Sequence, residues 1–223
     1  MRNSILFFGL VFISSFLNAQ RYEFDYLLQW STTTKFGTSN RLYFINSNNP
    51  NYRILIFDQP DGQLYAWLED YADTDKHVRH VFNVVVTDPS SGKYRFIYGS
   101  TYKTGNYGHI KMGKLQLKKI DHNFYAISIY NTKGSQMPYA SFEFYLEESD
   151  DLILFNNMEN PKYLLFQPLI EAALPKDKKY TITRYITKNT YGTASDEKLI
   201  SKQKIALTLE VTADQLRFKT KKN

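Results

Sequence analysis

The sequence contains no cysteine among its 223 residues, and it has only four histidines. The absence of cysteine excludes disulfides, thiolate metal sites and cysteine nucleophiles. A domain of about 200 residues can bury a sizeable core, so it does not need disulfides for stability. The chain also lacks the glycine-rich spacing of a phosphate-binding loop and the Gly-x-Ser-x-Gly motif of serine hydrolases. Nothing in the sequence indicates a cofactor, and we expect none.

Long apolar runs are missing as well, apart from one at the start of the chain. Residues 5–17 form this run, which follows Arg2 and ends shortly before Ala19. It is shorter than the roughly 20 residues of a membrane-spanning helix, and its layout is that of a secretory signal peptide. We therefore expect residues 1–19 to be a cleaved signal peptide and 20–223 to be a single β domain in the periplasm or outside the cell. No cysteine follows the run to carry a lipid, and no later segment is apolar enough to form a spanning helix.

Positive charge is concentrated in the last third of the chain. Residues 161–223 carry seven more basic than acidic side chains, whereas residues 20–160 carry two more acidic than basic ones. Such an excess would favour contact with an anionic membrane surface. Solvated lysines on strand faces and at the chain end would produce the same excess. Nucleic acid is not an expected partner, because no arginine-rich aromatic module is present.

Short runs with alternating apolar side chains dominate the sequence from residue 20 onward. Residues 22, 24, 26, 28 and 30 are all aromatic or leucine, and this period of two predicts a strand with one buried face. Turn-forming residues such as Asp88-Pro89-Ser90-Ser91-Gly92 separate the runs. We predict a mainly β fold. Roughly eleven antiparallel strands form one strongly curved meander sheet, a half-barrel or barrel, with one or two short helices near 161–174.

An acidic stretch at 69–75 is the first candidate site. Asp70, Asp73 and Asp75 lie between two strand runs, and oxygen-rich loops suit Ca²⁺. The spacing is not that of an EF-hand, and a solvated acidic turn explains the same residues. The carboxylates could otherwise serve a glycan hydrolase. His77 and His80 follow this stretch. Residues three apart in a strand point to opposite faces, so these two histidines cannot readily bind the same metal ion. His80 is expected to be a hydrogen-bonded core residue.

Aromatic side chains are the second feature, with 18 Tyr, 16 Phe and 2 Trp. Tyr65 and Trp67 share one face of a predicted strand, and the loop at 99–113 contributes Tyr102 and Tyr107. Tyrosine carries a hydroxyl that requires water or a hydrogen-bond partner. Tyr65 and Trp67 could line a cavity for an apolar or sugar-like ligand, although a packed sheet or barrel interior would also use them. Tyr102 and Tyr107 could form a ligand-contacting surface on the loop, although an irregular hairpin explains that segment equally well.

The opening strand Tyr22-Glu23-Phe24-Asp25-Tyr26-Leu27-Leu28, after a signal ending Asn-Ala-Gln, resembles small uncharacterised exported β-rich proteins of Gram-negative bacteria. The predicted curved sheet with helices at its mouth is also similar to the half-barrel of bacterial lipoprotein carriers. That resemblance implies an extracytoplasmic binding or carrier-like protein for an apolar or lipid-like ligand. A secreted hydrolase using carboxylates from 69–75 is the alternative, and an outer-membrane-associated structural protein is the second alternative. A non-enzymatic role is favoured over an enzyme.

Overall fold

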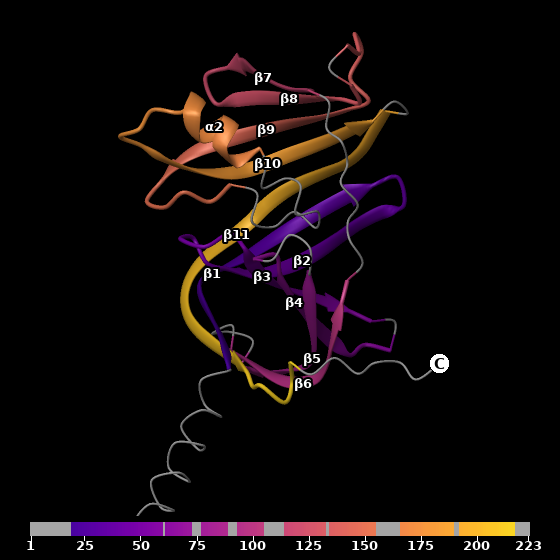
Figure 1. Ribbon diagram of the computed structural model, residues 1–223, viewed down its shortest axis with the longest axis vertical. Coiled ribbons are helices and arrows are strands. Elements are labelled where there is room, and N and C mark those ends of the chain that lie inside the picture. The colour runs from indigo at the N-terminus through magenta and orange to yellow at the C-terminus, as the bar shows by residue number, and fades with distance from the viewer. Residues whose placement is uncertain are drawn as a thin grey trace, which may run out of the picture.

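One antiparallel sheet of eleven strands forms the protein, together with a short helix (Figure 1). The computed structural model describes residues 19–59, 61–72, 77–88, 93–104, 114–132, 134–154, 166–189 and 192–216, so residues 1–18 of the expected signal peptide lie outside it. The strands are β1 (Gln20–Thr34), β2 (Gly37–Ile45), β3 (Tyr52–Asp58), β4 (Leu64–Asp70), β5 (Val78–Asp88), β6 (Lys93–Lys103), β7 (Lys114–Asp121), β8 (Phe124–Tyr130), β9 (Ala140–Ser149), β10 (Lys179–Asn189) and β11 (Gly192–Val211). The predicted fold class is confirmed.

The strand order is β6-β5-β4-β3-β2-β1-β11-β10-β9-β8-β7. Each strand therefore pairs with its neighbour in the sequence, as a meander requires, except at two places. The first and last strands, β1 and β11, pair at the centre of the sheet. The consecutive strands β6 and β7 lie at its two opposite edges. The long β1–β11 pair is thus a common spine for two halves of the sheet.

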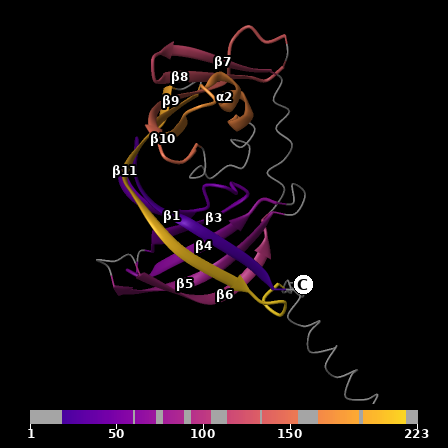
Figure 2. The same ribbon diagram turned by 90° about the vertical axis from the view of Figure 1, so that its left-hand side faces the viewer.

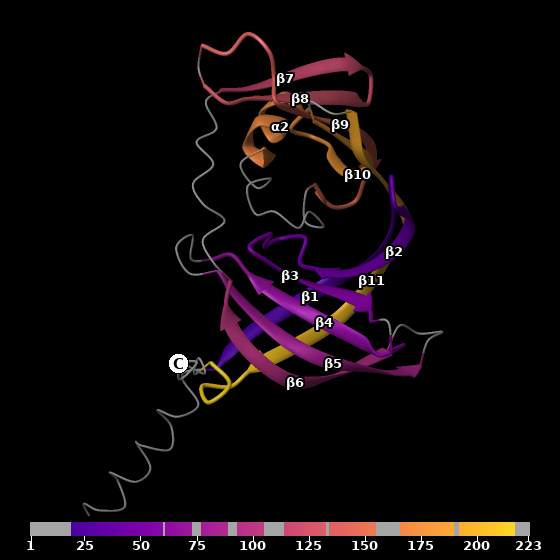
Figure 3. The ribbon, with the colours of Figure 1, turned by 90° about the vertical axis from the view of Figure 1, so that its right-hand side faces the viewer.

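The two halves bury opposite faces of the same sheet. Figures 2 and 3 show α2 inside the curve of β7–β10, while β3–β6 curl below them around the other face. In a strand, successive side chains point to opposite faces, so a central strand serves both cores. On β2, Tyr43 and Ile45 belong to one core cluster, and Phe44 belongs to the other.

The cluster on the first face, here called the helix-side cluster, lies between the spine, β8–β10 and α2 (Gln167–Ala173). Pro168 stands in the first turn of α2, where its missing N–H costs no hydrogen bond. The ring of Phe142 on β9 packs against Phe166, and both Phe166 and Ile170 are fully buried. The helix predicted within 161–174 is confirmed for 167–173, while residues 161–165 lie outside the described part.

The cluster on the second face, here called the half-barrel cluster, is enclosed by β1–β6 and the second half of β11. Phe44 on β2 lies 5.6 Å from the ring of Tyr94 and 5.7 Å from that of Phe96 on β6, although three strands separate β2 from β6. Only a strongly curled sheet allows this contact. The other main members of the cluster are Tyr22, Phe24, Leu27, Ile54, Ile56, Ala66, Leu68, Phe82, Val84 and Val211.

The prediction that residues 22, 24, 26, 28 and 30 share one face is wrong. Tyr22 and Phe24 belong to the half-barrel cluster, whereas Tyr26, Leu28 and Trp30 belong to the helix-side cluster. The pairing of β1 with β11 shifts register between Phe24 and Tyr26, so that two residues of β11 stand opposite Asp25 alone. The change of face on β1 coincides with this irregularity, at the point where β1 begins to pair with β2 as well as with β11.

Candidate binding site at the β6–β11 seam

Two unpaired strand edges face each other on the half-barrel side of the molecule. β6 pairs only with β5, and it ends the sheet. The pairing of β11 with β10 ends at Lys198, so from Leu199 onward β11 pairs with β1 alone. Every pairing from β1 to β6 is antiparallel, and so is β1 with β11, which makes β6 and β11 run in the same direction. We call the space between them the seam.

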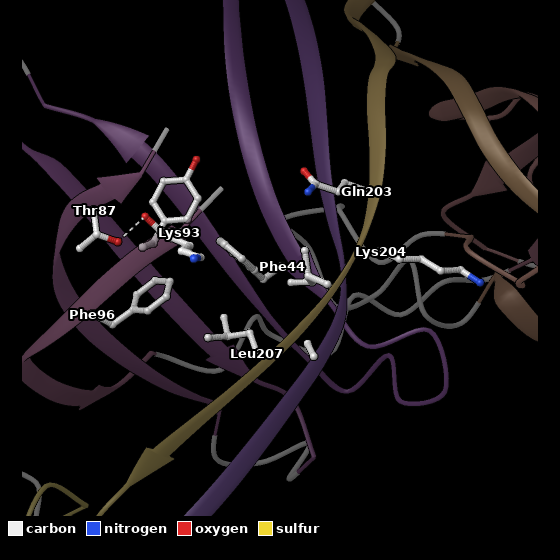
Figure 4. Close-up of a pocket in the computed structure, with 10 residues that line it drawn as sticks. Phe44, Thr87, Lys93, Phe96, Gln203, Lys204 and Leu207 are labelled. Carbon is white, nitrogen blue, oxygen red and sulfur yellow. Dashed lines mark hydrogen bonds between the residues drawn. The ribbon is translucent and has the colours of Figure 1, made fainter. Parts of the chain in front are cut away.

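An open pocket of about 480 Å³ lies at the seam. Figure 4 shows Phe44, Phe96 and Leu207 converging on it from β2, β6 and β11. The remaining lining residues are Thr87, Lys93, Tyr94, Gln203, Lys204, Ile205 and Ala206. Phe44, Phe96, Ile205, Ala206 and Leu207 supply the apolar part of the lining, and Thr87, Lys93, Tyr94, Gln203 and Lys204 add polar groups. Its volume lies within the range of about 300–1,000 Å³ that is typical of small-molecule sites, and its mixed lining suits a ligand with both apolar and polar parts.

Charge at the pocket comes from lysine. Lys93 is exposed at the start of β6, and its backbone carbonyl accepts a hydrogen bond from Thr87. Lys204 extends away from the pocket in Figure 4, and its ammonium group lies 3.5 Å from a carboxylate oxygen of Asp151. Lys93 is therefore the cation that could meet an anionic group of a ligand.

The β11 bulge shapes this pocket and a neighbouring one. Ile205 and Ala206 are the two residues that stand opposite Asp25, and both line the 480 Å³ pocket. They also line a second pocket of about 380 Å³, which reaches to Glu23 and Asn46. Bulges often occur next to binding sites, because they redirect side chains and end regular pairing.

The sequence-predicted aromatic residues lie elsewhere, on the helix-side face of β4 and β6. The guanidinium of Arg79 lies 4.0 Å from the ring centre of Trp67, and it donates a 3.4 Å hydrogen bond to the hydroxyl of Tyr102. Tyr65 stacks against Phe57. The structure thus joins Trp67 and Tyr102 through Arg79, but neither they nor Tyr65 line the two seam pockets. Tyr107 lies outside the described residues.

A buried ionic cluster borders this aromatic group. The carboxylate of Glu69 on β4 pairs with Arg53 of β3 at 2.8 Å and with Arg79 of β5, and it accepts a hydrogen bond from Tyr71. Burial by itself would raise the pKa of Glu69, but the charges of the two arginines and the hydrogen bonds outweigh it and lower that pKa. Arg53 is 2 % exposed, so this cluster holds three strands together rather than presenting a free charge.

Asp70 faces the half-barrel cluster and accepts a 2.8 Å hydrogen bond from the hydroxyl of Tyr22. Beside it His80 is fully buried, and its Nδ1 lies 2.6 Å from the hydroxyl of Thr101, which confirms the expectation of a hydrogen-bonded core histidine. Burial lowers the pKa of His80 to about 4, although Asp70 opposes the shift. Asp73 and Asp75 lie outside the described residues. Within the described ranges, no three His, Asp or Glu side chains are grouped as metal ligands.

Several lysines of the basic last third are already engaged. Lys178 pairs with Glu148, Lys188 pairs with Glu143, and Lys202 donates a hydrogen bond to Ser149. Contact of this region with an anionic membrane stays a prediction. In the part of the chain that the structure describes, no helix has the length and apolar character needed to cross a membrane.

Sequence reasoning did not find the seam. The alternating runs at Tyr94–Tyr98 and Ile205–Leu209 identify both bordering strands, but about 110 residues separate them in the sequence. Only the central β1–β11 pairing and the curl of the sheet place these strands side by side. No local turn sequence indicates the β1–β11 pairing or the curl of the sheet.

Comparisons with known proteins give little further guidance. No protein-family model matches the chain, and no curated protein matches it. Among solved structures, it is similar to a domain from Vibrio parahaemolyticus provisionally described as an outer membrane lipoprotein-sorting protein. That match covers 82% of this chain and 85% of the other, with 8% identity and a TM-score of 0.22. Its description falls in the group of lipoprotein carriers to which the predicted half-barrel was compared.

Proposed function

We propose that the chain is an extracytoplasmic binding protein that holds an apolar or lipid-like ligand in the seam between β6 and β11. The observation that carries the proposal is the open 480 Å³ pocket with Phe96 and Leu207 in its lining, bordered by two strand edges. The extracytoplasmic location rests on the expected signal peptide at residues 1–19. No catalytic group is assigned.

The lining favours an amphiphile over a fully polar ligand. Phe44 is buried in the half-barrel cluster, and Phe96 and Leu207 pack against the same cluster. Phe96 and Leu207 are only half-buried, so covering them with an acyl chain would remove apolar surface from water, at about 25 cal/mol for each Å². The ammonium group of Lys93 could then pair with an anionic head group at the open end.

A fluorescent fatty acid tests this proposal. Ala206→Trp places a large ring in the pocket, and we expect it to weaken binding at least about tenfold, which corresponds to 1.4 kcal/mol. Ala194→Trp is the matched control, because Ala194 is exposed on the same strand and lines neither seam pocket. Equal affinity of the two variants, or no binding by the wild-type protein, would contradict the assignment.

The unpaired edges support a second candidate, an extended peptide. A strand running antiparallel to both β6 and β11 could pair with both, because those two strands run in the same direction. Peptides are bound in this way at exposed sheet edges. A peptide should then lose affinity when its backbone nitrogens are methylated, since methylation removes the N–H donors. A fatty acid needs no such donors, so competition between the two probes separates the candidates.

A further inference from the structure

Two large apolar side chains are far more exposed than any others in the described part of the chain. Phe36 is 89 % exposed and Met137 is 82 % exposed, whereas the next value is 56 % for Ile200. Both lie in connections between strands, Phe36 between β1 and β2 and Met137 between β8 and β9. Neither side chain belongs to a core cluster.

The register of the sheet places both connections at the same end. Thr34 pairs with Gly37 next to Phe36, and the neighbouring Thr33 pairs with Asp196 near the start of β11. The turn between β10 and β11 lies at this same end of the sheet. Asn189, the last residue of β10 before that turn, pairs with Ala140 at the start of β9. In Figure 1 these connections lie along the right-hand side of the sheet. Four strand spacings of about 4.8 Å separate the two connections, or roughly 20 Å.

The hairpin that carries Phe36 does not need this side chain. The backbone N–H of Phe36 donates to the hydroxyl of Thr34, and Gly37 takes the positive φ of 126° after the turn. Glycine, asparagine and aspartate are the residues that such tight turns favour, because they tolerate positive φ or bond to the local backbone. A phenyl ring at this tip therefore adds nothing to folding that the structure shows.

A positive charge lies beside the Phe36 tip, and the described connecting residues at both tips carry no negative charge. The ammonium group of Lys35 lies 4.9 Å above the ring of Phe36. The described connecting residues at 35–36, 131–132 and 134–139 include no aspartate or glutamate. On the adjoining strands, Glu143 pairs with Lys188 and Asp196 pairs with Arg184, so these two carboxylates are already neutralised.

We propose that this end of the sheet docks on an anionic lipid bilayer, with Phe36 and Met137 entering the interface at two points. Apolar side chains on an exposed tip gain free energy when they enter the acyl boundary, and a lysine beside them is attracted to anionic lipids. Two anchors roughly 20 Å apart would fix the orientation of the protein on the surface. The proposal does not depend on the identity of the seam ligand.

Sedimentation with phosphatidylglycerol vesicles tests this assignment. All described elements lie between Gln20 and Leu216, so protein beginning at Gln20 avoids any contribution from the apolar segment before it. We expect the double variant Phe36→Ser with Met137→Ser to partition at least about tenfold more weakly than the wild-type protein. Ile120→Ser is the control, because Ile120 is 46 % exposed near the opposite end, and it should bind as the wild-type protein does.

Three results would overturn the proposal. The first is absence of vesicle binding by the wild-type protein, and the second is an equal loss in the Ile120→Ser control. The third is concentration-dependent dimerisation of the wild-type protein that the double variant loses, without vesicle binding by either. That result would show that Phe36 and Met137 contact a second copy of the chain. Circular dichroism of each variant should match the wild-type protein, since the substituted side chains are exposed.

Discussion

The half of the sheet covered by α2 and the half that curls on itself bury their apolar side chains in different ways. On the helix-side face, Phe166 and Ile170 fill the curve of β8–β10. On the other face no helix is available among the described residues, and β1–β6 must close against β11 with strand side chains alone. That closure stops short of pairing β6 with β11, and both seam pockets border the resulting edge of β11. The candidate site therefore arises where the sheet lacks a covering helix.

The largest effect is expected at the buried ionic cluster, which lies on strands β3–β5 of the curled half but on the helix-side face of the sheet. Glu69→Gln would leave Arg53 and Arg79 without their shared carboxylate, and it should destabilise the protein by about 3–5 kcal/mol in urea unfolding. Asp196→Asn is the comparison, because it breaks the more exposed pair with Arg184 and should cost at most about 1 kcal/mol. Similar losses of unfolding free energy in the two variants would show that burial of the cluster does not determine the size of the effect.

A second comparison removes one aromatic ring from each half. Phe166→Ala and Phe82→Ala each empty a fully buried site, so each should cost about 3 kcal/mol or more. Because both halves share the β1–β11 spine, each variant should still unfold in a single transition when followed by fluorescence and by circular dichroism. Separate transitions for the two probes would mean that the halves unfold independently.

The smallest of these effects concerns pH. The pKa of His80 is lowered to about 4 in the folded protein, whereas an unfolded histidine titrates near 6.5. The unfolded state therefore binds a proton first, so stability is lost as the pH falls from about 6.5 to 4, by at most about 3 kcal/mol. The variant His80→Gln should lack this part of the decrease. The two proteins would have parallel stability curves over that range if His80 were not responsible.

Most of the fold could be predicted, because it depends on local signals. Alternation identifies strands such as residues 142–146, and the non-alternating segment near Pro168 indicates a helix. The assignment of faces fails at Asp25, where the pairing of β1 with β11 is irregular, because the sequence of β1 alone does not record how the strand is paired. The candidate site is missed for the same reason, since β6 and β11 meet only through the whole topology. Trp67 and Tyr102 both contact Arg79, a proximity that the sequence did not indicate, and their role as ligand contacts stays a prediction.

The most direct test of the account is to find which face of the sheet holds the ligand. Nuclear Overhauser contacts between the protons of a bound fatty acid and the aromatic rings of the protein report this in one experiment. If the ligand lies in the seam, contacts are expected to Phe44 and Phe96 and none to Tyr65 and Trp67 on the helix-side face. Contacts to Tyr65 and Trp67 without any to Phe44 and Phe96 would contradict the account and would favour the aromatic surface predicted from the sequence.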